Sequence, residues 1–181
     1  NTFFDALDSG SKVTVTGIVS EFPDIISSGL TQIGIDSMSP PISSLPTLKK
    51  RSIPIQVNVT DFDSLGTVKF LTGEKYEGMY VQLNNLTVGP QSLSGVRNVR
   101  RLIDAQGNFI YLRDFSNFFS TGPSPSWGWT AWAPPSIGAT ITSIRGVILN
   151  SAYADGNGGL YPYVIVPVYP NDLVLGNAPP F

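Results

Sequence analysis

KVTVTGIVSEF, residues 12–22, is the stretch that indicates the fold class, because apolar and polar residues alternate along it with a period of two. Val13, Val15 and Val19 share one face of this alternation, and Thr and Ser residues occupy the other. β-branched residues in such a pattern are typical of a half-buried strand. Gly17 interrupts the run, and a glycine inside a strand predicts a bend or a bulge.

The same pattern returns far along the chain. GATITSIRGVI, residues 138–148, again has a glycine, alternating apolar residues and a second glycine followed by two apolar residues. Each copy is followed by a loop and a short apolar run, at residues 31–35 and 163–167. Two copies of a strand pair suggest two related modules. Only the second copy has a set of strand-like runs before it, from residue 79 to residue 113.

Further alternating runs predict strands at residues 53–59, 79–88 and 161–168. The runs at 96–103 and 108–113 flank Asp-Ala-Gln-Gly, which favours a hairpin turn. No segment sustains a helical period, and only one brief helical turn is expected, at residues 74–78. The fold class predicted from these patterns is all-β.

Composition removes most kinds of chemistry. Only 13% of the 181 residues are charged. The net charge is −2, so the chain lacks the basic excess that is typical of a polyanion-binding protein. The 41% of hydrophobic residues argues against disorder. The absence of Cys and His excludes disulfides, thiol catalysis, Cys/His zinc sites and Ser-His triads. A hydrolase built from carboxylates alone is the one catalytic alternative. We therefore expect no enzyme, no metal site and no cofactor.

GEKYEGMYV, residues 73–81, resembles the E-x-Y-E-G-M-x-V signature of OB-fold-like β modules in secreted and cell-surface proteins of Bacteroidetes-type bacteria. VTGIVSEF with LTQI, residues 15–22 and 30–33, is similar to that family's V-x-G-x-V-x-E-Y and L-T-Q-I pair. GNFIYLRD, residues 107–114, matches its G-x-x-I-x-V-x-D strand. The resemblance covers roughly residues 10 to 175. It implies an OB-like Greek-key barrel with an additional N-terminal β-hairpin.

The domain organisation expected from both arguments has three parts. Residues 1–48 form a β segment that corresponds to the last strands of a preceding OB-like module. Residues 52–176 form a complete OB-like barrel, and residues 177–181 form a tail or linker. A two-stranded ribbon is marginally stable in water, so the first segment must dock on the barrel, pair with upstream sequence or be completed by a neighbouring molecule. We expect the last two together, with Val13, Val15 and Val19 facing a partner chain or an exposed groove.

The resemblance also implies a setting and a function. Similar modules form the non-catalytic region of large extracellular nucleases, whose chemistry belongs to a separate metal-dependent domain that needs His residues. This chain is therefore expected to be a secreted or cell-surface structural or adhesive module of a larger assembly, with a protein partner or a second copy at its strand edges. No run approaches the ~18 apolar residues of a membrane span, so no membrane insertion is expected.

The alternative function is an accessory module that binds nucleic acid or glycan. Its candidate ligand-binding residues are Trp127, Trp129, Trp132, Arg97 and Arg101, because exposed aromatic rings stack on bases or sugars and basic residues beside them contact phosphates. The structural interpretation is that the Trp rings pack as a lid over the barrel or against a neighbouring subunit. The Arg residues, like the cluster at residues 49–51, would then only protect strand edges.

Short patterns indicate modification sites. Asn58 and Asn85 begin N-x-T glycosylation motifs. Ser37 and Ser64 lie in Asp-Ser-apolar motifs of the kind associated with O-glycosylation in the exported proteins of the similar family. The loop at residues 155–159 resembles the start of a calcium loop but lacks its later ligands, and is interpreted as a plain hairpin loop. The acidic pairs Asp61/Asp63 and Glu74/Glu77 are interpreted as turn-forming and surface residues.

Overall fold

The computed structural model describes residues 14–22, 30–38, 52–90, 100–114, 116, 118–120, 132–150 and 163–176. Strands dominate these residues and helices are few, which confirms the all-β prediction. The strands are β1 (Val15–Phe22), β2 (Leu30–Met38), β3 (Ile55–Gln56), β4 (Asp63–Ser64), β5 (Thr67–Val68), β6 (Tyr80–Val88), β7 (Arg100–Ile103), β8 (Phe109–Leu112), β9 (Thr140–Asn150), β10 (Tyr163–Val166) and β11 (Leu173–Leu175). The helical segments are α1 (Phe70–Gly73) and the 3₁₀ turns Val59–Asp61, Glu74–Tyr76 and Pro170–Asp172.

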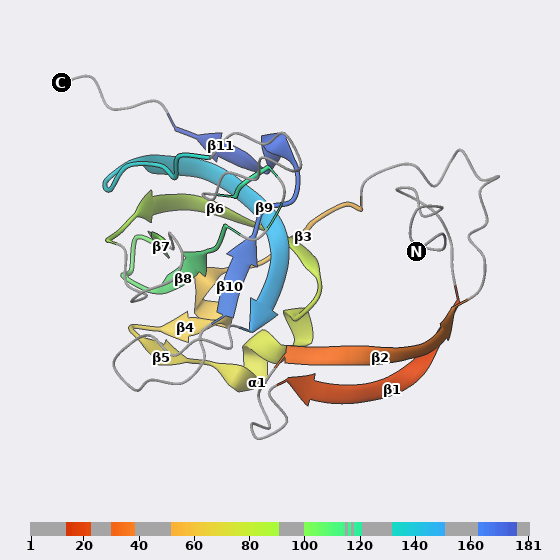
Figure 1. Cartoon of the computed structure of the whole chain (residues 1–181). Coiled ribbons are helices and arrows are strands. Elements are labelled where there is room, and N and C mark those ends of the chain that lie inside the picture. Colours follow the sequence, from red (N-terminus) through yellow and green to blue (C-terminus); the bar gives the residue numbers. More distant parts are fainter. Residues whose placement is uncertain are drawn as a thin grey trace.

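Five strands close into a barrel (Figure 1). β6 pairs with β7, β7 with β8, β8 with β10, β10 with β9, and β9 returns to β6. All these pairs are antiparallel except β8–β10, which is parallel. The fourth strand of the five thus lies beside the first, which is the Greek-key closure of an OB-type barrel. The OB-like prediction is confirmed.

β6 and β9 form the seam of the barrel, and the sequence explains how they curve. Asn85 has a φ of 55°, a left-handed conformation that Asn tolerates better than most residues. Because of it, Leu83 and Leu86 are both buried although an odd spacing would place them on opposite faces of a regular strand. In β9 a Cβ atom on Gly146 would lie 2.6 Å from the carbonyl oxygen of Val166, so only glycine lets β10 approach.

The barrel interior is filled by aliphatic side chains from all five strands. They include Val81, Leu83, Leu86, Val88, Leu102, Ile110, Leu112, Ile141, Ile144, Ile148 and Ile165. Burying one such side chain contributes about 1.5–3 kcal/mol. Phe62 and Tyr163 lie 5.6 Å apart between ring centroids, and Phe70 of α1 lies 6.1 Å from Tyr163. These rings pack the turn segment that contains α1 against the barrel core.

Two sequence predictions about this barrel were wrong in detail. The strand expected at 53–59 is reduced to β3, because Val59 begins a 3₁₀ turn and the carboxylate of Asp61 accepts the N–H of Asn58. Of the run expected at 161–168, residues 161–162 lie outside the described residues and the strand β10 ends at Val166, before residues 167–168. The sequence patterns missed β11, which pairs with the first half of β9. The predicted hairpin turn after Ile103 is present, with Gly107 at a φ of 90°.

β1 and β2 form a separate two-stranded antiparallel sheet, so the additional hairpin is confirmed. Their register shifts between Thr16 and Gly17, where the sequence predicts a bulge. A Cβ atom on Gly17 would collide with the carbonyl oxygen of Gly34. Figure 1 shows the hairpin extending away from the barrel, with the end of β1 and the start of β2 beside α1.

Candidate functional site

The hairpin presents the largest group of exposed aliphatic side chains on neighbouring strands of the described residues. Ile18 is 69% exposed and Val19 66%, while Ile33 is 54% and Ile35 50% exposed. Val15 is 39% exposed, and Val13 lies outside the described residues. Within the part of the chain that the structure describes, no third strand pairs with β1 or β2. Val19 pairs with Ile33 and Gly17 with Ile35, so Val15, Val19, Ile33 and Ile35 lie on one face, which is called the hairpin surface below, and Ile18, opposite Gly34, lies on the other face.

Glu77 connects the hairpin to the barrel. Its Oε2 accepts the backbone N–H of Thr31 in β2 at 3.1 Å, and its Oε1 accepts the backbone N–H of Asn150 in β9 at 3.2 Å. Burial raises the pKa of this carboxyl, the two N–H groups oppose the rise, and the charge of Glu74 adds to it. The sequence alone interprets Glu77 as a surface residue, but the structure places it half-buried between two elements. The only feature of the sequence that singled out Glu77 is its place in the GEKYEGMYV stretch.

Glu74 has a different partner. Its Oε2 accepts the hydroxyl proton of Tyr163 at 2.9 Å. Burial and this acceptor together raise the pKa of Tyr163 far above its ordinary value, so the phenol stays protonated. The Glu74–Tyr163 contact therefore fixes the turn segment on the barrel end and offers no activated base.

A stacked cluster lies on the outer face of β7 and β8, the strands that OB domains use for ligands. The guanidinium carbon of Arg101 lies 4.5 Å from the ring centroid of Phe109 and 5.9 Å from that of Tyr111. Tyr111 is only 2% exposed. Arg100 lies opposite Leu112 and has the parity of buried Leu102, so it points away from Arg101 as the sequence predicts. Arg97 lies outside the described residues.

Of the three Trp candidates, the structure describes Trp132 alone. Its ring meets that of Phe119 edge-on at 5.2 Å, and it packs against the barrel core. Trp127 and Trp129 lie outside the described residues, as do the basic cluster at 49–51 and the loop at 155–159. Of the five candidate ligand-binding residues, the structure therefore describes only Trp132 and Arg101, and they belong to different clusters.

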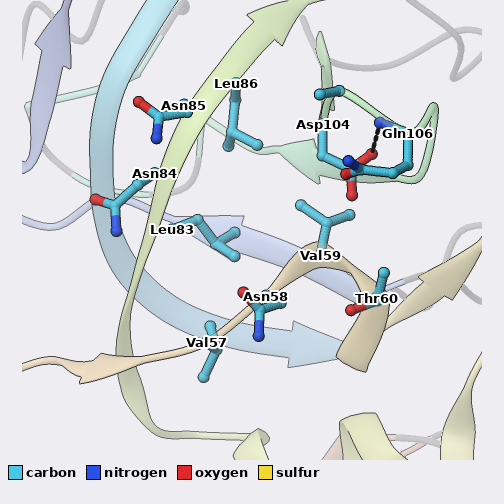
Figure 2. A pocket seen from close by; sticks show the side chains of 11 residues that line it. Val57, Asn58, Val59, Thr60, Leu83, Asn84, Asn85, Leu86, Asp104 and Gln106 are labelled. Carbon is cyan, nitrogen blue, oxygen red and sulfur yellow. Dashed lines mark hydrogen bonds between the residues drawn. The ribbon is translucent and has the colours of Figure 1, made fainter.

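A pocket of about 370 Å³ opens between three segments of the barrel. Its lining comes from residues 57–60, from residues 83–86 in β6 and from residues 104–106 in the β7–β8 turn. Figure 2 shows Leu83, Leu86 and Val59 directed toward the same space, with Asn84 and Asn85 on the other side of β6. The candidate glycosylation residues Asn58 and Asn85 both belong to this lining. They are exposed, as are Ser37 and Ser64.

The acidic side chains near this pocket serve the backbone. Asp63 accepts the N–H groups of Gly66 and Phe109, each at 3.1 Å. Asp61 accepts the N–H of Asn58, as the turn-forming interpretation expects. Among the described residues no group of three or more acidic side chains is placed to hold a metal ion.

No protein-family model, curated protein or solved structure matches this chain. None of the helices among the described residues is long and apolar enough to cross a membrane. The fold itself defines the class of protein, an OB-type β-barrel that carries an outlying β-hairpin.

Proposed function

We propose that the chain is a non-enzymatic structural or adhesive module that joins a larger assembly through the β1–β2 hairpin. The observation that carries this proposal is the exposed hairpin surface on a sheet of only two described strands. A two-stranded hairpin is marginally stable in water, and open strand edges are templates for pairing. Strands supplied by another polypeptide segment would cover the apolar side chains and occupy the edges.

The barrel supplies a template for that partner. β1–β2 and β9–β10 are both antiparallel pairs in which a glycine of the first strand lies against a carbonyl of the second, Gly17 on Gly34 and Gly146 on Val166. In the barrel, β9 also takes β6 as an antiparallel neighbour and β10 takes β8 as a parallel one. By the same pattern, β1 would pair with an antiparallel strand of the partner and β2 with a parallel one. The partner would then supply the remaining strands of a second OB-like module.

The non-enzymatic part of the proposal rests on the inventory of side chains. The chain has no His and no Cys. The carboxylates of Asp61, Asp63 and Glu77 accept backbone N–H groups, and that of Glu74 accepts a tyrosine hydroxyl. All four carboxylates thus already accept a hydrogen bond from the protein. The secreted or cell-surface setting rests on the family resemblance and on the low charge of the chain.

Sedimentation velocity on the 181-residue chain tests the assembly role. We expect concentration-dependent association that Val19→Lys weakens at least about tenfold, because a buried unpaired charge costs more than the 1.4 kcal/mol that a factor of ten represents. Ile137→Lys is the matched control, since Ile137 is 64% exposed but lies in the turn before β9. A wild-type chain that stays monomeric at all concentrations, or a control that weakens association equally, contradicts the proposal.

The second candidate function, binding of nucleic acid or glycan on the OB face, is favoured by the Arg101–Phe109–Tyr111 cluster. The geometry of the cluster also argues against it, because Arg101 already covers the Phe109 ring on which a base would stack. A saturable change in Trp fluorescence on addition of single-stranded DNA or an oligosaccharide, lost in Arg101→Ala, would support this candidate. The assembly proposal expects no such change.

A further inference from the structure

We propose that the pocket between residues 57–60, β6 and the β7–β8 turn binds one neutral sugar or polyol unit. The pocket contains no residue of the hairpin surface and does not include Glu77, so this inference is independent of the assembly role. Its volume of about 370 Å³ lies within the range of about 300–1,000 Å³ that is typical of small-molecule sites. It holds a ligand of one ring better than a polymer.

The lining of the pocket contains both apolar and polar side chains. Figure 2 shows Val59, Leu83 and Leu86 directed toward the same space, and these residues are only 3%, 1% and 2% exposed. Thr60 and Gln106 lie at the rim on the side of the β7–β8 turn. A pyranose ring or a cyclic polyol matches the polar rim, because its hydroxyls both donate and accept hydrogen bonds.

The charge of the lining selects against anions. The polar side chains on the side of the pocket are the carboxamides of Asn58 and Gln106, the hydroxyl of Thr60 and the carboxylate of Asp104, because Asn84 and Asn85 lie on the other side of β6, and no Lys or Arg lines the pocket. A phosphate or nucleotide would therefore meet one negative charge and no positive one. Carboxamides and hydroxyls both donate and accept, whereas a carboxylate only accepts, so the set suits a ligand whose hydroxyl groups do both.

The rim is partly fixed before any ligand arrives. Asp104 Oδ1 accepts the N–H groups of Gln106 and Asn108, both at 2.9 Å, and its Oδ2 accepts Nδ2 of Asn108 at 2.8 Å. Asn108 is itself 5% exposed and accepts the N–H of Leu65 through Oδ1. The side chains of Thr60 and Gln106 have no hydrogen-bond partner among the described residues. A rigid carboxylate beside two available polar groups lowers the ordering cost of binding.

The experiment is an NMR titration of the 181-residue chain with methyl β-D-glucopyranoside, N-acetyl-D-glucosamine and myo-inositol. We expect at least one of them to shift the amide signals of residues 58–60 and 104–108 in a saturable way in the millimolar range. Thr60→Val and Gln106→Ala should each weaken binding about tenfold, which is the effect of one lost hydrogen bond. Ala105→Trp, which places a large ring at the rim, should abolish it.

Two controls make the result decisive. Thr67→Val changes an exposed Thr of β5 outside the pocket and should leave binding unchanged. Glucose 6-phosphate, the anionic probe, should bind at least tenfold more weakly than the neutral sugars. Absence of saturable shifts with all three neutral probes overturns the proposal. Equal affinity in Thr60→Val and the wild type overturns it too, as does glucose 6-phosphate binding as tightly as a neutral probe.

Discussion

Glu77 shows how much a single residue decides in this molecule. One carboxylate accepts N–H groups from β2 and β9, elements that are distant in the sequence. No local pattern announces this role, because a Glu beside a Gly in a turn is ordinarily solvated. The contact depends on where Thr31 and Asn150 arrive in space, which periodicity does not reveal. Asp61 was interpreted correctly as a turn-forming residue. Its partner Asn58 lies only three residues away, so the contact is local and visible in the sequence.

The raised pKa of Glu77 predicts a pH dependence. The folded state holds the Glu77 proton more tightly than the unfolded chain, whose carboxyl has the ordinary value of 4.5. The resulting stabilisation is fully present below pH 4.5 and is lost as the pH rises through the folded pKa. Glu77→Gln removes it, so the free energy of unfolding of the wild type relative to this variant should fall with rising pH across that window. Urea denaturation at a series of pH values measures this difference.

Ser64→Ala changes an exposed, non-titrating side chain and serves as the control for that series. It should reproduce the wild-type pH profile. If the free energies of unfolding of Glu77→Gln and of the wild type change with pH in the same way, the carboxyl of Glu77 is not buried in solution.

At the scale of the elements, strands with strict alternation were predictable and those shaped by distant partners were not. β6 and β9 lie where their patterns predict, and Gly17 forms the predicted irregularity. β3 is shorter than predicted because a local cap ends it. β11 has only three residues and depends on pairing with β9. For the candidate sites, the pocket was missed because its walls come from three separate segments.

The two glycines of the hairpin allow a matched test. A Cβ atom on Gly17 would collide with the carbonyl oxygen of Gly34, whereas a Cβ atom on Gly34 would meet nothing closer than the Ile18 oxygen at 3.7 Å. Gly17→Ala should therefore separate β1 from β2, and Gly34→Ala should not. Hydrogen exchange of the hairpin amides should accelerate at least about tenfold in Gly17→Ala, since overpacking costs about 1–3 kcal/mol. Equal exchange in the two variants would show that the register of β1 and β2 is different in solution.

At the scale of the whole molecule, the core and the hairpin are separate. Every buried residue of the two described apolar clusters lies between Val57 and Val166, and none belongs to β1 or β2. The side chains described in β1 and β2 are all exposed. The described core therefore contains no side chain of the hairpin. The apolar side chains of the hairpin are not covered by the described part of the barrel. This division is the basis of the proposed role in assembly.

The same division predicts that residues 52–176 fold on their own. Removing residues 1–51 and 177–181 deletes no side chain of the described core and breaks the Thr31–Glu77 hydrogen bond. The free energy of unfolding in urea should fall by no more than the about 0.5–1.5 kcal/mol that one such hydrogen bond contributes. The fragment should also sediment as a monomer at concentrations at which the full chain associates, because it lacks the hairpin surface. A fragment without a cooperative unfolding transition would show that the segment before residue 52 completes the barrel, and a fragment that associates as the full chain does would place the assembly contact on the barrel itself.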